Sequence, residues 1–499
     1  MTLSRRQLGQ AAALLALPGL GLDALAQRAK DSLVLGMVLE PSPGLDPTTA
    51  PAAAIGEVVH YNILEGLTKI TDAGAVLPLL ATDWTSDPDG KTYTFKLRGG
   101  VKFQDGTPFN ADAVKFSFER AKAPDSTNKA KKTVFDNISS IAAPQPDVVI
   151  LTLTNPDATL PFRLGEATAV ILSPQSAATT ATQPVGTGPF RLENWQKGSA
   201  ITLTRWDGFR DVAAIKLRRV TFRFINDNAA QVAALMAGDI DGMPRFGAVQ
   251  ALAQLRADKR FTVSVGSTAG KGILAINNKR KPLDDVRVRR AISHAIDRQA
   301  FIDGVLEGLG KPIGSHAAPT DVGYVDLTGL YPFNPDKAKA LLKEAGISAP
   351  LNLTLTLPPP SYARKGGEVV AAMLAKVGIV AKIENVEWAQ WLSGPFKGNF
   401  DLTIINHVEP LDYVQYANPQ YYWGYDNPAF NTLVKKRAEA ARGKAQVQLY
   451  ADIQRQIAND AVNAFLFNPS QVSVSRKGLK GLWVNSPVAA NDLSQVSWQ

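Results

Sequence analysis

Two carboxylates lie close together in an aromatic segment near residue 410. Residues 408–426 read VEPLDYVQYANPQYYWGYD, with Glu409 and Asp412 three positions apart. The two prolines prevent one continuous helix, so we expect a loop. A carboxylate that leaves water needs a cation or several hydrogen-bond donors beside it, and a ligand ammonium group can supply that charge. We therefore predict that Glu409 and Asp412 bind the amine of a small solute, with His407 beside them.

The segment around these acids is rich in aromatic residues. Ten occur between residues 388 and 425, far more than the chain average of 8% predicts. Aromatic rings offer a large contact area at a small cost in side-chain entropy, and they commonly line ligand sites. We assign Phe396 and Phe400 to the core. The predicted ligand wall consists of Trp388, Trp391, Tyr413, Tyr421, Tyr422 and Trp423.

Other chemistries lack the residues that they need. The four histidines have no metal-binding spacing and the chain has no cysteine, so we predict no metal and no cofactor. Ser126-x-x-Lys129 occurs without the companion motifs of penicillin-recognising enzymes, and no G-x-S-x-G element is present. Residues 266–272 imitate a phosphate loop but are too short, and we interpret them as a crossing between domains. Without these catalytic motifs we expect no enzyme, and because the net charge of +9 comes without a basic run, we expect no nucleic-acid partner.

The amino-terminal residues are typical of an export signal. Residues 1–26 combine a charged start, an apolar run and the small-residue site Ala24-Leu25-Ala26, where we expect cleavage. The pair Arg5-Arg6 favours the twin-arginine route over general secretion. A lipid anchor would need a cysteine, which the chain lacks. We expect a soluble, monomeric periplasmic protein.

Positioning the acidic loop requires α/β elements on both sides of it. Residues 351–357 alternate as a strand, 367–377 have helical spacing, and 380–386 form another strand. Asp285 and Asn334 are suited to cap the helices that follow them. The other expected elements are strands at 32–39, 92–97, 200–205 and 220–224, and helices at 55–67, 226–238, 285–296 and 334–346.

Five blocks occur in the order typical of one family. The blocks are PLLATDWTSDPDGKTYTFKLRGGVKFQDGTPFNADAVKFSFER (78–120), PVGTGPFRLENWQKGSAITLTR (184–205), LMAGDIDGM (235–243), INNKRKPLDDVRVRRAISHAIDRQAFIDGVLEGLG (276–310) and NPDKAKALLKEAGI (334–347). Together they resemble the extracytoplasmic solute-binding proteins of peptide and nickel ABC importers, family 5. The resemblance extends from about residue 33 to the end of the chain.

This resemblance implies an α/β fold with two lobes, a type II Venus flytrap, with a small α/β domain inserted in lobe 1. We assign 27–59, 170–270 and 471–499 to lobe 1, 60–169 to the inserted domain, and 271–470 to lobe 2. The implied function is the capture of a peptide-like solute between the lobes and its delivery to an ABC permease in the inner membrane. A nickel chelate, an opine or a sugar remains an alternative ligand, and a secreted hydrolase is the alternative from another class.

The resemblance also guides the choice of ligand residues. In the peptide-binding branch an aspartate after an FDL-like strand, here Phe400-Asp401-Leu402, pairs with the ligand's α-amino group. Alignment places Pro410 or its neighbours there, so Glu409 and Asp412 both stay candidates. The dipeptide branch clamps the ligand carboxylate with an arginine where this chain has Leu357, and Arg364 is the nearest cation for a ligand anion.

Overall fold

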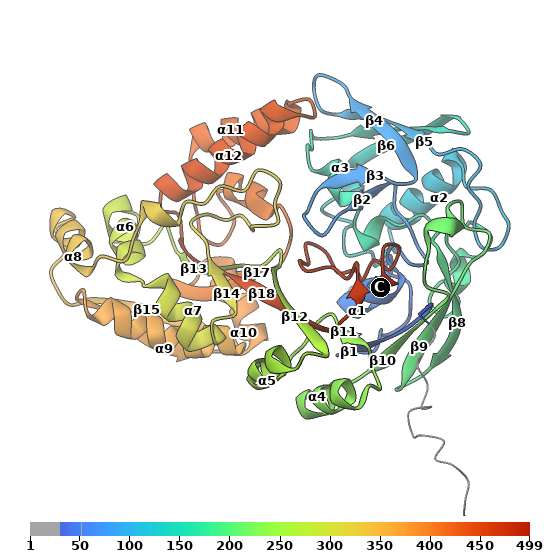
Figure 1. The fold of residues 1–499 in the computed structure, drawn as a ribbon. Helices are drawn as coiled ribbons and strands as arrows, with labels where there is room; N and C mark the ends of the chain where they lie inside the picture. Colours follow the sequence, from blue (N-terminus) through green and yellow to red (C-terminus); the bar gives the residue numbers. More distant parts are fainter. Residues whose placement is uncertain (1–29, 51) are drawn as a thin grey trace, which may run out of the picture.

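The computed structural model describes residues 30–50 and 52–499, so the predicted leader at 1–26 lies outside the described residues. Figure 1 shows two α/β bodies with a smaller one beside the first. We use lobe 1, insertion domain and lobe 2 for the residue sets assigned above. The mixed α/β class predicted from the sequence is confirmed.

One long strand, β18 (Ala464–Arg476), passes through both lobes. Its first part pairs with β13 of lobe 2, and its second part pairs with β11 and β12 of lobe 1, antiparallel in each case. The lobe 1 strands are β1 (Ser32–Met37), β8 (Phe190–Gln196), β9 (Ala200–Arg205), β10 (Arg219–Phe224), β11 (Gly242–Met243) and β12 (Phe261–Ser267). Its helices are α1 (Ala53–Val59), α4 (Asn228–Ala237) and α5 (Leu252–Ala257), and a short hairpin of β19 (Leu479–Lys480) and β20 (Ser497–Trp498) follows β18.

Lobe 2 is built on a sheet that carries a buried cluster of side chains on each of its two faces. Its strands are β13 (Lys271–Ile276), β14 (Gly310–Pro312), β15 (Leu351–Leu357), β16 (Ile379–Asn385) and β17 (Leu402–His407). Its helices are α6 (Val286–Ala295), α7 (Arg298–Leu306), α8 (Pro335–Glu344), α9 (Ser361–Ala375), α10 (Trp388–Ser393), α11 (Pro428–Glu439) and α12 (Lys444–Asn459). Aliphatic residues from β13, β15 and β17 pack with α6 and α9 to form its core.

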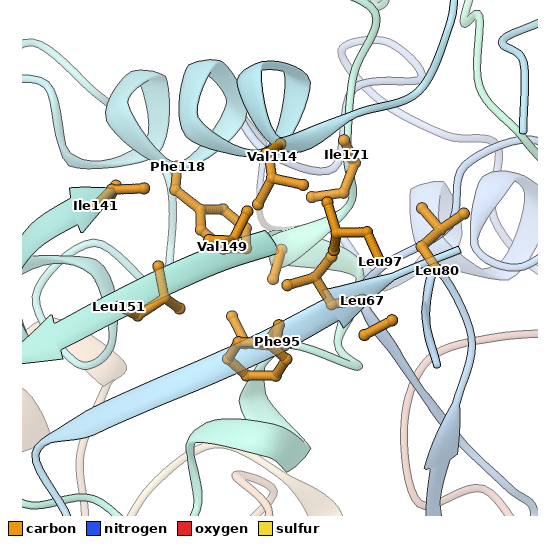
Figure 2. Packing of buried hydrophobic residues seen from close by; sticks show 14 of the residues in the cluster. Leu67, Leu80, Phe95, Leu97, Val114, Phe118, Ile141, Val149, Leu151 and Ile171 are labelled. Carbon is orange, nitrogen blue, oxygen red and sulfur yellow. The ribbon is translucent and has the colours of Figure 1, made fainter. Parts of the chain in front are cut away.

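The insertion domain has a sheet of its own, in the order β4-β5-β7-β6. The strands are β4 (Ala81–Ser86), β5 (Thr92–Leu97), β6 (Ile138–Gln145) and β7 (Val148–Leu153), with α2 (Ala111–Lys122), α3 (Leu160–Arg163) and a hairpin of β2 (Thr68–Ile70) and β3 (Val76–Pro78). In Figure 2, Val114 and Phe118 of α2 lie over Val149 and Leu151 of the sheet. This core is separate from the cores of the two lobes.

Two expected elements differ from the structure. The helix expected at 55–67 ends at Val59, because Tyr61 takes a positive φ of 65° that an α-helix cannot continue through. The Tyr61 hydroxyl then donates to Gly165 O at 2.7 Å and fixes this turn. The helix expected at 367–377 begins earlier, at Ser361 directly after Pro360, and it includes Gly366 and Gly367 because these glycines allow close packing on Phe301 and Leu357.

The helix caps read from the sequence are confirmed, and one of them can be tested. The side chain of Asn334 accepts a hydrogen bond from Lys337 N at 2.9 Å, with Pro335 in the first turn of α8. Replacing Asn334 by Ala leaves that N–H without its acceptor, so we expect the free energy of unfolding to fall by about 1 kcal/mol. Urea denaturation measures this, with Lys337→Ala as a control that keeps the cap. Equal stability of both variants would contradict the prediction.

Candidate functional site

The strand directions bring the carboxyl ends of both sheets to the same place. In lobe 2, β15 and β17 are parallel to each other and β17 is antiparallel to β13, so both end where β13 begins. In lobe 1, β1 and β11 are parallel to each other and antiparallel to β18, so they also run toward the crossing between the lobes. Open α/β sheets bind ligands at the carboxyl ends of their strands. The loop after β17, residues 408–412, lies at this position.

The lobes are joined by two short crossings, 268–270 and 468–469, between the paired strands β12, β13 and β18. Asn468 Nδ2 donates to Thr268 O at 2.8 Å and to Gly270 O at 2.7 Å, and Thr268 Oγ1 donates to Pro469 O at 2.9 Å. Residues 266–272, which we interpreted as a crossing between domains, contain this connection between β12 and β13. Two adjacent strands of this kind form a hinge about which two rigid bodies can rotate.

A buried ion pair lies just beyond the hinge, beneath the loop. Lys271, the first residue of β13, donates from Nζ to Asp412 Oδ1 at 2.7 Å, and the two side chains are 1% and 8% exposed. The same ammonium group donates to the carbonyl oxygen of Glu409. A buried ammonium group requires several acceptors, and two of the acceptors of Lys271 belong to the loop at 408–412. The loop is therefore held against the first residue of β13.

Two histidines complete the coordination of the Asp412 carboxylate. His316 Nε2 lies 3.0 Å from Oδ1 and His407 Nδ1 lies 3.2 Å from Oδ2. An ionised carboxylate only accepts, so both ring nitrogens donate. The other ring nitrogens accept from hydroxyl groups, His316 Nδ1 from Tyr416 at 3.0 Å and His407 Nε2 from Tyr422 at 2.9 Å. Every side chain of this network is therefore hydrogen-bonded.

The protonation states agree with this network. Burial lowers the pKa of His316 to about 4, against the opposing attraction of Asp412, so the ring is neutral at neutral pH. Burial also opposes ionisation of Asp412, yet the facing histidines and the Lys271 ammonium group keep its pKa well below the usual range. Since His316 is neutral, the Lys271 ammonium group supplies the positive charge that keeps the Asp412 carboxylate ionised. The carboxylate that we predicted for the solute is thus bound by donors of the chain itself.

Three of these groups are also arranged as a metal ion would require. Among the described residues, 30–50 and 52–499, three side chains each place one possible ligand atom within 4.8 Å of the other two; they are His316, His407 and Asp412. The spacing of the histidines along the chain did not predict this cluster. However, the Lys271 ammonium group already contacts Asp412 and would repel a second cation. We therefore assign the cluster to loop support and not to metal binding.

Four residues of the predicted aromatic wall lie inside lobe 2. They pack in one cluster below the loop, each 4% exposed or less, and comprise Trp391, Tyr413, Tyr422 and Trp423. Trp391 Nε1 donates to Thr403 Oγ1 at 3.0 Å, as a core tryptophan does. Phe400 is buried in the same cluster and Phe396 packs against it, as assigned from the sequence. These rings shape the loop from behind and present little surface to a solute.

The remaining predicted residues are accessible. Glu409 is exposed, and its carboxylate has no hydrogen-bond or ion-pair partner in the described part of the chain. Trp388 is 42% exposed and Tyr421 is half-buried. Burial is the main cause of the raised pKa of Tyr421, and the negative charges of Asp412 and Glu409 contribute to it. Arg364 pairs with Glu387 at 3.0 Å instead of standing free. Glu409 is therefore the available carboxylate at this edge.

Sequence reasoning missed Lys271, His316 and Arg163. A lysine at the head of the otherwise apolar strand KGILAI was a usable signal, because a buried ammonium group requires an acid nearby. Arg163, the last residue of α3, donates from Nη2 to Pro410 O at 2.8 Å and so brings the insertion domain to the loop. Its position beside the loop depends on tertiary packing alone.

No helix among the described residues is both long and apolar enough to cross a membrane. Residues 75–428 match the family described as bacterial extracellular solute-binding proteins, family 5 Middle. The chain is 30% identical over 469 residues to the dipeptide-binding protein of Escherichia coli (strain K12), covering 85% of this chain and 86% of that protein.

Solved structures show the same fold. The unliganded open form of the murein tripeptide-binding protein MppA has a TM-score of 0.84 at 22% identity, over 94% of this chain and 98% of that one. The binding protein AgaA from A. tumefaciens R10, in complex with agropinic acid, has a TM-score of 0.72 at 27% identity, over 94% and 98%. The family match and the relative from E. coli together show that this chain belongs to the bacterial extracellular solute-binding proteins of family 5.

Proposed function

We propose that this chain is the periplasmic substrate-binding component of an ABC importer. It captures a peptide-like or amino-acid-derived solute between its lobes, leaves it chemically unchanged and delivers it to an inner-membrane permease. The observation that carries this proposal is the hinge of two adjacent crossings, toward which the carboxyl ends of strands from both lobes point. Closure about such a hinge buries a ligand and changes the outer surface that a permease contacts.

The solute class follows from relatives and from the loop. The relatives include proteins named for binding dipeptides and glutathione, and a solved structure holds agropinic acid. All three solutes derive from amino acids. In this chain Glu409 offers a free carboxylate beside Trp388 and Tyr421, which suits an ammonium group next to an apolar part of a solute. Asp412 and His407 support this loop from below, and Arg364 is the proposed contact for a solute anion after release from Glu387.

The role of Glu409 is testable with defined probes. Glu409→Gln keeps the shape of the side chain and removes its charge, so we expect the Kd for neutral dipeptides with a free amine to rise at least about tenfold, a loss of about 1.4 kcal/mol. Isothermal titration calorimetry with a panel of such dipeptides gives the affinities. Asp336→Asn, which removes a fully exposed acid of the same lobe that pairs only weakly with Lys339, serves as the control and should change the Kd little. Unchanged affinity of the Glu409 variant would place the amine elsewhere.

The function itself is tested by identifying what the protein carries. Native mass spectrometry of the exported protein is expected to show a bound solute of peptide-like mass that is lost on unfolding and refolding. A sugar or a nickel chelate in that position would keep the carrier role and change the solute class. Steady turnover of peptides that depends on Ser126 would instead establish the hydrolase, and would overturn the proposal.

A further inference from the structure

Two cations hold neighbouring carbonyl groups of the loop at 408–412. The Lys271 ammonium group donates to Glu409 O, and Arg163 Nη2 donates to Pro410 O at 2.8 Å. Lys271 belongs to lobe 2, whereas Arg163 belongs to the insertion domain, where Glu166 Oε2 lies 3.4 Å from its Nη1. The loop is therefore held from both sides of the hinge at once.

The residue between these two supports has an unfavourable backbone conformation. Leu411 has a φ of 52°, in the left-handed region that a branched side chain rarely adopts. Such a conformation persists only where the surrounding structure fixes it. The Lys271–Asp412 pair fixes the residue after Leu411, and Arg163 fixes Pro410 before it. Loss of either support allows Leu411 to relax and the loop to change shape.

The contact of Arg163 is part of a larger interface. On the same side of the molecule the Arg442 guanidinium group lies 4.2 Å from the ring centroid of Trp84 in β4. A Cβ atom on Gly90, in the β4–β5 turn, would lie only 2.4 Å from Ala438 O at the end of α11. Figure 1 shows α11 and α12 beside the insertion domain. The insertion domain thus docks on lobe 2 at several points far from the hinge.

We propose that Arg163 is a positioning residue of the solute site, and that the insertion domain holds the loop at 408–412 in its binding shape only while it is docked on lobe 2. Separation of the lobes removes Arg163 from Pro410, and Leu411 relaxes. The shape of the loop is then coupled to closure, so a bound solute and a closed molecule stabilise each other. The significance of this coupling for solute binding rests on the proposed function.

Hydrogen–deuterium exchange measures this support without any ligand. In Arg163→Met we expect amides in 408–417 to exchange several-fold faster than in the wild type, because the loop opens more often. Amides of β5 and β7 should exchange at unchanged rates. Arg98→Met is the matched control, since Arg98 Nε donates to Leu79 O at 3.0 Å within the insertion domain and does not touch the loop.

Unchanged exchange at 408–417 in Arg163→Met, or an equal change in Arg98→Met, would overturn the inference. If Arg163→Met does not fold, Arg163→Lys keeps the charge beside Glu166 and shortens the donor, so the same faster exchange is expected. Faster loop exchange with unchanged dipeptide affinity would show that Arg163 supports the loop, and would count against the loop as the solute site. The two proposals therefore fail in different ways.

Discussion

Replacing Lys271 by Met should lower the free energy of unfolding at pH 7 by about 3–5 kcal/mol, because it leaves the Asp412 carboxylate buried without its cation. Methionine fills nearly the same volume, so the loss is electrostatic and not a matter of packing. His316, which is neutral, still donates to Asp412 but cannot supply a full charge. Chemical denaturation at pH 7 measures the change.

Two further variants separate this pair from ordinary ion pairs. Lys271→Met with Asp412→Asn removes both charges, so most of the stability should return and the double-mutant cycle should show strong coupling. Arg280→Met breaks the surface pair with Asp401, where the arginine side chain is 54% exposed, and should cost less than about 1 kcal/mol. A small effect of Lys271→Met, similar to that of Arg280→Met, would show that the pair is not essential.

Local sequence signals predicted many elements of this fold correctly. The alternation in TYTFKL gave β5, and Asp285 and Asn334 begin α6 and α8 as expected. These signals work because capping and alternation act within a few residues. The end of α1 was not predictable in the same way, since the positive φ of Tyr61 is fixed by a hydrogen bond to Gly165, 104 residues further along the chain.

The site was predicted only in part for a similar reason. The sequence located the loop and its acids, but it could not distinguish the exposed Glu409 from the buried Asp412. That distinction depends on Lys271 and His316, and His316 lies 96 positions before Asp412. Aromatic enrichment was likewise ambiguous, because rings that line a site and rings that support it from behind have the same composition. Only tertiary contacts resolve these roles.

Mild acid should destabilise the protein strongly, because His60 and His316 are buried in their neutral forms. Burial lowers the pKa of His60 to about 3, with Asp492 and Lys69 as the nearby charges, and the pKa of His316 to about 4. In the unfolded chain the pKa of both rings has its ordinary value of about 6.5. Between these values the unfolded chain binds more protons, so stability is complete above about pH 6.5 and falls as the pH decreases.

The expected loss is large because two groups contribute to it. One pKa unit corresponds to about 1.4 kcal/mol, so the two histidines together remove on the order of 5 kcal/mol between pH 6.5 and pH 4. Asp412 acts in the same direction at lower pH, since its depressed pKa contributes stability that is lost as the pH falls toward its folded value. Urea denaturation at pH 7, 6 and 5 measures the slope.

Substitutions assign this slope to the two residues. His60 is fully buried and its ring centroid lies 3.8 Å from that of Tyr61, so His60→Phe keeps a stacked ring that cannot accept a proton. His316→Gln keeps a donor for Asp412. Each variant should weaken the dependence of stability on pH. If the wild type were equally stable at pH 7 and pH 5, neutral burial of these rings would be excluded, since two protons cannot be withheld from the folded state without cost.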